Sequence, residues 1–321
     1  MSNNRQKCFS KVKPKIFIAG QEGMVGSAIL RLFKKKKLNI ISCTRKELDL
    51  TNQNDVKRWI NKKKPEIVIN AAGRVGGILD NSNYKSDYIY INSMIGMNLI
   101  HSSLNNGVKK FINLGSACIY PKNTKQPIKE EQLLDSALEQ TNEGYALAKI
   151  STLKYCEYLK QKFKKDYISL QPTNLYGEND NFNLKSSHVL PALVKKFYLA
   201  KKNNKKEVEV WGSGKVKREF LNVDDLADAI YFCIKKKIPY SYLNVGSGDC
   251  DSIKDLAYKL KFISKFKGKI KFNKKYPDGV SERKLDSSKI KKLGWKKKIT
   301  LNRGLHLFYQ YYEGLINKNE R

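Results

Sequence analysis

Tyr145 and Lys149 form the first pattern in this chain whose residue types and spacing could carry chemistry. On a helix this spacing puts the phenol and the ammonium on one face. A nearby cation lowers the pKa of a phenol, so such a tyrosine can act as an acid or base near neutral pH. Ser116 follows a predicted strand, where its hydroxyl could hydrogen-bond a substrate carbonyl oxygen. Alone the pair is a weak signal, because the chain has 18 tyrosines.

Three glycines, Gly20, Gly23 and Gly26, separate an apolar run at 15–19 from a helical pattern that begins at Met24. The first glycine permits a tight turn, the second lets the backbone approach a pyrophosphate, and the third lets helix and strand pack closely. The phosphates then lie at the helix N-terminus. This strand–turn–helix context predicts a dinucleotide site. The other loop residues expected at that site are Gln21, Met24 and Val25.

The end of the second predicted strand indicates which dinucleotide to expect. NAD-binding units place an acidic residue about 20 residues beyond the glycine loop, whereas this chain has Arg45 and Lys46. A guanidinium suits a 2′-phosphate, so NADP is favoured over NAD; an exposed arginine at a strand end is the simpler alternative. Asp49 is expected either to shape the adenine pocket or to cap a helix that starts near Asn52.

Alternating strand and helix patterns must position these residues. Strands are expected at 15–19, 39–43, 66–71, 110–114 and 167–171, and helices at 24–36, 52–62, 88–103 and 145–162. This succession predicts an α/β fold, a Rossmann-type doubly wound parallel sheet with helices on both faces. Beyond residue 178 the pattern is less regular. Helices are expected at 188–200, 223–235 and 252–262, and strands at 207–211 and 241–245.

The change in pattern near residue 177 suggests two domains, as expected for a chain of 321 residues. We expect an NADP-binding Rossmann domain over residues 1–176, to which 216–246 returns. A smaller C-terminal α/β domain for the substrate is expected over 177–215 and 247–321.

The net charge is +33, from 63 Lys and Arg against 30 Asp and Glu, and alone suggests a polyanionic partner. The lysine runs, however, fall at predicted helix ends and in loops, and RRM-type, KH and Arg-rich signatures are absent from the sequence. A non-catalytic Rossmann-like protein that binds RNA is therefore only a remote alternative. We expect no nucleic-acid partner.

Neither a signal peptide nor a membrane helix is expected, because the first apolar run is short and no run reaches 18 residues. We therefore expect no membrane partner. The six cysteines are scattered without CxxC or metal-ligand spacing. This pattern predicts reduced thiols, no metal site and a cytoplasmic location.

In order along the chain, the motifs resemble the extended short-chain dehydrogenase/reductase family, and within it the 3,5-epimerase/4-reductases of GDP-4-keto-6-deoxymannose. The matching segments run from about residue 16 to about residue 295 and are IFIAGQEGMVGSAI, TRKELDL, RVGGI, LGSACIYPK, NEGYALAKI, PTNLYGENDNF, SSHVLPAL, VWGSG, REFLNVDD, NVGSG and PDG. The resemblance implies that Tyr145 is the general acid of an NADPH-dependent ketone reduction, supported by Lys149 and Ser116. It also implies that Cys118 and His188 transfer protons at C3 and C5 of the sugar.

Each of these last two residues has a simpler explanation, because a free cysteine is more often a small core residue and a lone histidine more often starts a helix or fills a core. The resemblance favours the catalytic roles. It further places a set of residues at the cofactor: Leu50, Leu114, Gly115, Lys149, Pro172, Asn174, Leu175 and His188.

For the substrate, the resemblance implies a GDP-sugar whose diphosphate is held by basic residues. The implied contacts are Asn174, Lys196, Trp211, Arg218, Asp278 and either Arg283 or Lys284. Alternatives are a solvated helix face for Lys196, a core aromatic for Trp211 and a surface ion pair for Arg218. A related GDP-4-keto sugar of the colitose or 6-deoxyheptose type is the close rival substrate. The resemblance also implies a homodimer formed by the helices at 88–103 and 145–162.

Two residues depart from the pattern of the family. Glu22 stands in the glycine loop where relatives often carry a basic residue, and a carboxylate near a 2′-phosphate is unfavourable. Arg45, together with Lys46, is then expected to hold the 2′-phosphate and so to favour NADP over NAD. Ala117 replaces a serine, which removes a minor hydroxyl.

Overall fold

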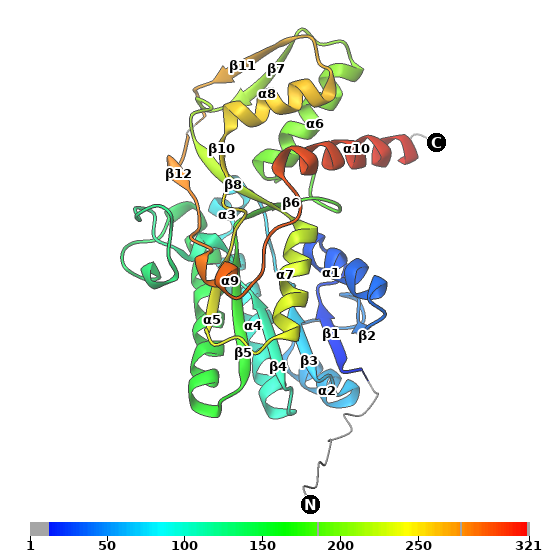
Figure 1. Cartoon of the computed structure of the whole chain (residues 1–321), viewed down its shortest axis with the longest axis vertical. Coiled ribbons are helices and arrows are strands. Elements are labelled where there is room, and N and C mark those ends of the chain that lie inside the picture. Colours follow the sequence, from blue (N-terminus) through cyan, green and yellow to red (C-terminus); the bar gives the residue numbers. More distant parts are fainter. Residues whose placement is uncertain (1–12, 185, 277, 320–321) are drawn as a thin grey trace, which may run out of the picture.

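The computed structural model describes residues 13–184, 186–276 and 278–319. Its largest element is a parallel sheet of six strands in the order β2-β1-β3-β4-β5-β9 (Figure 1). These strands are β1 (Lys15–Ala19), β2 (Asn39–Ser42), β3 (Ile67–Asn70), β4 (Lys110–Leu114), β5 (Asp166–Pro172) and β9 (Tyr242–Val245). The chain order reverses between β1 and β3, and open α/β sheets bind ligands at such a point, beyond the carboxyl ends of the strands. The predicted Rossmann-type fold is confirmed.

Alternation along each strand covers the two faces of this sheet. Ile16 and Ile18 of β1 pack in one apolar cluster with α1 and α7, whereas Phe17 and Ala19 belong to a second cluster on the other face. The helices are α1 (Met24–Lys35) and α7 (Val223–Lys235) on the first face, and α2 (Gln53–Lys63), α4 (Lys85–Asn105) and α5 (Glu143–Phe163) on the second. Because both faces are covered, the central strands are buried along nearly their whole length.

A second unit lies above the carboxyl edge of this sheet in Figure 1. In it β8 (Lys217–Asn222) pairs with β6, β10 and β12, and β7 pairs with β11. The other strands are β6 (Asn174–Tyr176), β7 (Glu207–Trp211), β10 (Cys250–Ser252), β11 (Lys269–Asn273) and β12 (Glu282–Arg283). Its helices α6 (Val189–Lys202), α8 (Ile253–Ser264) and α10 (Leu301–Asn319) enclose a separate core around Phe197, Leu256 and Phe308.

The boundary between the two units differs from the expected one near the C-terminus. α7 and β9 lie with the Rossmann unit, but so do Ile290 of α9 (Ser288–Lys292) and Trp295, both buried in the core beside α7. Trp295 also donates a hydrogen bond from its indole to Asp228 of α7, at 3.1 Å. The stretch 247–321 is therefore not one piece of the substrate unit. Within the described ranges, none of the helices is both long and apolar enough to cross a bilayer.

Sequence patterns placed the first-half elements to within three residues. The elements that were not predicted are α3 (Ile78–Asn83), β6, β8, β10, β11, β12, α9 and α10. β8 was missed because it begins with Lys217 and Arg218, which give no apolar alternation. β12 has two residues and forms only by pairing with β8. Both strands carry residues of the candidate site.

Candidate active site

The glycine loop makes a tight junction between β1 and α1. Gly20 has a φ of +84°, a left-handed conformation that favours glycine, and a Cβ on Gly26 would stand 2.0 Å from the Gly20 carbonyl oxygen. A Cβ on Gly23, in contrast, would meet only that oxygen, at 3.6 Å. The first turn of α1, which begins with Met24 and Val25 and follows Gln21, contains no acidic residue and has no side-chain cap. Its free amide groups therefore fit a pyrophosphate.

The end of β2 brings Arg45 beside the glycine loop. Arg45 is exposed, and its backbone N–H donates to a carboxylate oxygen of Glu22 at 3.4 Å. The negative charge noted in the sequence therefore lies at the expected 2′-phosphate position. Asp49 accepts hydrogen bonds from Thr51, at 2.9 Å from its nitrogen and 2.7 Å from its hydroxyl. Asn52 caps α2, so the alternative that Asp49 caps this helix is wrong.

Asn98 of α4 is a further residue at this end of the sheet, and sequence reasoning did not identify it. Its side-chain amide is buried and donates to the carbonyl oxygens of Leu50 and Thr51, both at 3.0 Å. It thereby fixes the turn that follows β2. A polar residue inside an apolar helical stretch was the signal that could have found it.

α5 places Tyr145 and Lys149 beside the end of β4. The Lys149 ammonium donates to the Leu114 carbonyl oxygen at 2.8 Å and lies 5.7 Å from the centroid of the Tyr145 ring. Burial lowers the pKa of Lys149 to about 8. Burial also raises the pKa of Tyr145, opposed by a hydrogen bond with Ser116. The ammonium is bound to a strand carbonyl in this geometry, and a lowering of the phenol pKa by Lys149 stays a prediction.

Ser116 and Cys118 lie on the turn that follows β4. The Ser116 N–H donates to the side chain of Gln171 at 2.9 Å, and the Ser116 hydroxyl accepts from the Cys118 N–H at 3.2 Å. Cys118 is a half-buried free thiol in a short 3-10 helix, η1 (Ala117–Ile119). Gln171, fully buried on β5, was not predicted; a polar residue in an apolar strand was its only signal. A Cβ on Gly115 would clash with it at 1.8 Å.

His188 lies directly before α6. It is the N-terminal boundary residue of that helix, without a side-chain cap, and is exposed, while nearby protein atoms lower the pKa of its imidazole by desolvation. The preceding Ser186 carbonyl accepts from the Gly77 N–H at 2.8 Å, which joins this segment to the loop before α3. Asp180, not predicted, has its pKa raised by burial to about 7.

β6 carries the residues expected at the nicotinamide end. Asn174 is exposed, and its side-chain amide donates to the Glu219 carbonyl oxygen at 2.9 Å. Pro172 is buried at the end of β5, and Leu175 is partly buried against the Rossmann core. The connection between the two units thus begins at the carboxyl edge of the sheet.

An aromatic and basic group lies on the substrate unit. The Lys196 ammonium stands 4.7 Å from the centroid of the Trp211 ring and donates to the Glu209 carbonyl oxygen at 3.0 Å. Trp211 stacks on Tyr276 with centroids 4.2 Å apart and planes 12° apart. Trp211 is 42% exposed, so the alternative that it is a core aromatic is wrong. Tyr276 was not predicted.

Four predicted substrate residues remain, namely Arg218, Arg283, Lys284 and Asp278. Arg218 and Arg283 are register partners on β8 and β12. Lys284 follows the end of β12, and its backbone N–H donates to the side-chain oxygen of Gln126 at 2.8 Å. Asp278 accepts from the Ser213 N–H at 2.7 Å and so holds the loop beside Trp211. The first residue of the PDG motif, Pro277, lies outside the described residues.

A dinucleotide cradle at the carboxyl edge of a parallel sheet, with a Ser–Tyr–Lys set beside it, is the site of a nucleotide-dependent oxidoreductase or epimerase. A family model described as the NAD dependent epimerase/dehydratase family matches residues 16–246. The chain therefore belongs to this family.

Individual relatives are similar over nearly their whole length. The chain is 47% identical to GDP-L-fucose synthase 1 of Arabidopsis thaliana, covering 93% of each protein. It is 42% identical to GDP-L-fucose synthase of Escherichia coli strain K12, covering 94% of this chain and 97% of the other.

Two solved structures are also similar. One, a GDP-6-OMe-4-keto-L-xylo-heptose reductase from C. jejuni, has a TM-score of 0.88 and 38% identity over 94% of this chain and 98% of its own. The other is a GDP-L-fucose synthetase from Naegleria fowleri bound to NADP. Its TM-score is 0.86 and its identity 27%, over 95% of this chain and 94% of its own.

Proposed function

We propose that this protein is an NADPH-dependent enzyme that converts GDP-4-keto-6-deoxy-D-mannose to GDP-L-fucose by inversion at C3 and C5 and reduction at C4. The observation that carries the proposal is the placement of Cys118 on the same turn as Ser116, beside Tyr145 and Lys149. Reduction alone needs only the last three. A thiol at the same point supplies a group that can exchange protons next to the ketone.

The reduction follows from the protonation states at the site. Bound NADPH supplies the hydride that reaches C4. Tyr145, whose pKa is raised, stays protonated at neutral pH, and a protonated phenol is the form that can donate a proton to the C4 oxygen. Ser116 hydrogen-bonds Tyr145 and can also hold that oxygen, while the Lys149 cation favours the negative charge that develops there.

The inversions need a base and an acid. A base removes the proton from C3 or C5, the electron pair passes to the C4 oxygen through an enolate, and an acid returns a proton to the opposite face of the carbon. We assign these two roles to Cys118 and His188. His188, with its pKa lowered, is neutral at pH 7, and a neutral imidazole has one donor and one acceptor nitrogen for such transfers.

NADP as the cofactor is supported by the exposed Arg45 at the end of β2 and by the NADP-bound relative. Arg45 is the residue we assign to the 2′-phosphate, and the first turn of α1 is assigned to the pyrophosphate. We assign Lys196, Trp211 and Arg218 to the GDP moiety of the substrate. The Lys196 ammonium and the Arg218 guanidinium suit a diphosphate, and the Trp211 ring suits a base.

One experiment tests the substrate directly. The purified protein is incubated with NADPH and GDP-4-keto-6-deoxymannose, and the product is analysed by NMR. The expected outcome is NADPH oxidation with GDP-L-fucose as product. GDP-4-keto sugars of the colitose and 6-deoxyheptose types are assayed in parallel, because the heptose reductase resembles this chain nearly as closely. A higher kcat/KM for one of those sugars would contradict the proposal.

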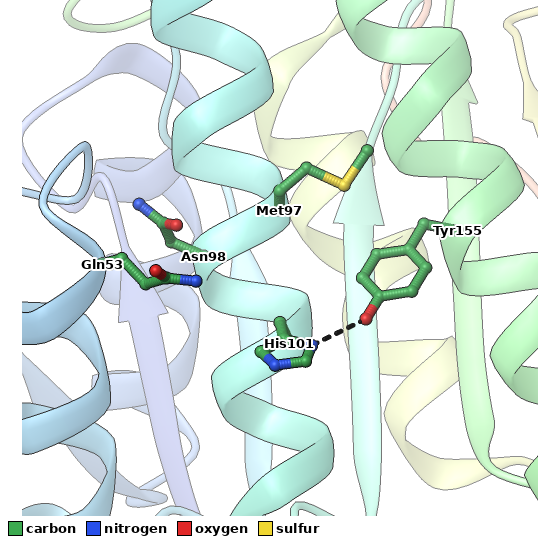
Figure 2. A pocket seen from close by; sticks show the side chains of 5 residues that line it. All are labelled: Gln53, Met97, Asn98, His101 and Tyr155. Carbon is green, nitrogen blue, oxygen red and sulfur yellow. Dashed lines mark hydrogen bonds between the residues drawn. The ribbon is translucent and has the colours of Figure 1, made fainter.

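We also propose a homodimer in which a second copy packs on α4 and α5. Tyr90 and Tyr158 on these helices are 63% and 56% exposed, a large apolar area for a free surface. Figure 2 shows residues of α2, α4 and α5 that line a pocket. Its volume is about 250 Å³, and in it the His101 ring nitrogen Nδ1 lies 2.9 Å from the Tyr155 hydroxyl. Tyr155 is about 15 Å along the helix from Tyr145 at 1.5 Å per residue, so this pocket is separate from the candidate active site.

A cytoplasmic location is the last part of the proposal. It is supported by the thiols at Cys43, Cys118, Cys156, Cys233 and Cys250, which are free in the described part of the chain, because reduced thiols are typical of that compartment. Cys8 lies outside the described residues.

A further inference from the structure

The guanidinium of Arg283 is bound to the backbone of the Cys118 turn. Its Nη1 donates to the carbonyl oxygens of Ala117 at 3.0 Å and Tyr120 at 3.3 Å, and its Nη2 donates to that of Pro121 at 3.0 Å. Sequence resemblance had assigned either Arg283 or its neighbour to the diphosphate. In the fold, Arg283 instead contacts three carbonyls from a segment more than 160 residues earlier in the chain.

These three carbonyls lie within and directly after η1, the short helix that carries Cys118. The amino end of the same helix is held by the Ser116 hydroxyl, which accepts from the Cys118 N–H at 3.2 Å. The backbone of Cys118 is thus fixed from both sides, and one of the two contacts comes from the catalytic Ser116.

The strand pairing explains why Arg283 reaches this turn. β12 runs parallel to β8 with Arg283 opposite Arg218, so the two side chains project from the same face. Arg218 donates to the Val280 carbonyl oxygen at 2.7 Å. Burial lowers the pKa of Arg218, and the neighbouring charge of Arg283 lowers it further. Of the two guanidiniums, Arg283 is the one that binds the backbone of the Cys118 turn.

We propose that Arg283 is a positioning residue, which holds the Cys118 turn for proton transfer at the sugar and does not bind the substrate's diphosphate. The inference rests on the proposed function, because it names a residue on which the inversion steps depend. A planar guanidinium can span several carbonyls with fixed geometry, whereas a lysine ammonium is a point charge on a flexible stem. A misplacement of about 1 Å at a reacting group can cost about 100-fold in rate.

The test compares Arg283→Met and Arg283→Lys with Arg58→Met, a matched loss of an arginine on the exposed face of α2. Solvent deuterium incorporation at C3 and C5 of the GDP-4-keto sugar measures proton transfer, and calorimetric titration with GDP measures nucleotide binding. We expect Arg283→Met to slow incorporation by about 10- to 100-fold, with the Kd for GDP changed by less than about twofold. Arg283→Lys should restore part of the rate, and Arg58→Met should match wild type.

A second measurement needs no substrate and serves if Arg283→Met does not fold. The rate of Cys118 alkylation by iodoacetamide, followed by mass spectrometry, reports the accessibility and reactivity of the thiol. We expect Arg283→Lys to change that rate by more than about threefold. The same measurement on Arg58→Met is the control, and its rate of Cys118 alkylation should match wild type.

Three outcomes separate the possibilities. Loss of GDP affinity of about 10-fold or more in Arg283→Met, with its incorporation rate per bound complex unchanged, would make Arg283 a diphosphate ligand and overturn the inference. Unchanged incorporation and unchanged alkylation would overturn it as well. A wild-type protein that neither oxidises NADPH nor exchanges deuterium with the GDP-4-keto sugar would instead refute the proposed function, whatever the variants do.

Discussion

The side-chain nitrogen of Lys149 donates a buried hydrogen bond to the carbonyl oxygen of Leu114, at 2.8 Å. This contact joins the helix that carries Tyr145 to the strand that ends at Leu114, two residues before Ser116, and so relates two parts of the Ser–Tyr–Lys set in space. The same burial lowers the pKa of Lys149 to about 8. The positive charge of Lys149, which the reduction uses, is thus close to being lost at physiological pH.

The first prediction concerns the pH dependence of the reduction. Because the Lys149 ammonium loses its proton near pH 8, kcat for NADPH oxidation should fall as the pH rises through this value. The buried phenol of Tyr145, with its raised pKa, should stay protonated over the same range. A pH–rate profile with excess substrate and cofactor measures this, and a rate that rises through pH 8 would contradict it.

The second prediction concerns the free energy of unfolding, which should change with pH in the opposite direction to kcat. The pKa of Lys149 is about 8 in the fold and 10.5 ordinarily, so between these values the unfolded chain binds more protons. The free energy of unfolding should therefore rise with pH in this window, by at most about 3 kcal/mol. Urea unfolding of wild type and Lys149→Met across the window isolates the effect as the difference between the two curves. Parallel curves would show that Lys149 is not the group responsible.

The third prediction concerns cofactor preference. The Glu22 carboxylate accepts from the Arg45 N–H where the 2′-phosphate is expected, so it should repel NADPH more than NADH. Glu22→Gln should raise the ratio of NADH Kd to NADPH Kd by about 3- to 10-fold, and the gain should shrink with added salt. Nucleotide fluorescence on binding provides both constants. Glu207→Gln, on β7, is the control, and an unchanged ratio in Glu22→Gln would refute the prediction.

The fourth prediction uses the chain's own glycines. An alanine at Gly26 would put its Cβ 2.0 Å from the Gly20 carbonyl oxygen, whereas a Cβ at Gly314 of α10 has no atom within 4 Å. Gly26→Ala should lose NADPH binding because the loop must shift. Gly314→Ala should bind normally and gain about 0.5–1 kcal/mol, because alanine favours helix. Titration with NADPH and thermal unfolding compare the two, and normal binding by Gly26→Ala would show that the loop tolerates the change.

The fifth prediction separates the two halves of the reaction. Cys118→Ser should bind NADPH as wild type does, because Cys118 is not among the residues assigned to the cofactor, but it should stop deuterium uptake at C3 and C5. His188→Asn provides the companion measurement. If deuterium enters both carbons of the substrate at the wild-type rate in Cys118→Ser, the thiol has no role in proton transfer.

Local patterns predicted a large part of this protein. The glycine spacing, the alternating apolar strands and the four-residue spacing of Tyr145 and Lys149 each depend on neighbours within one or two turns of chain. The steric limit at Gly26 is also local, because a Cβ there would meet the carbonyl oxygen of Gly20, six residues earlier in the chain. Such features are readable because the backbone geometry of a strand, a turn or a helix fixes which nearby side chains share a face.

Long-range pairing decided the rest. Gln171 supports Ser116 from the next strand, Asn98 fixes the turn after β2, and Arg283 holds the Cys118 turn only because β12 pairs with β8. The sequence by itself determined the Rossmann unit and the residue types of the site. Strand register and burial decided which of two adjacent cations binds the Cys118 turn. They also decided that Lys149 binds a strand carbonyl. Those arise only when distant segments pack, so no spacing along the chain encodes them.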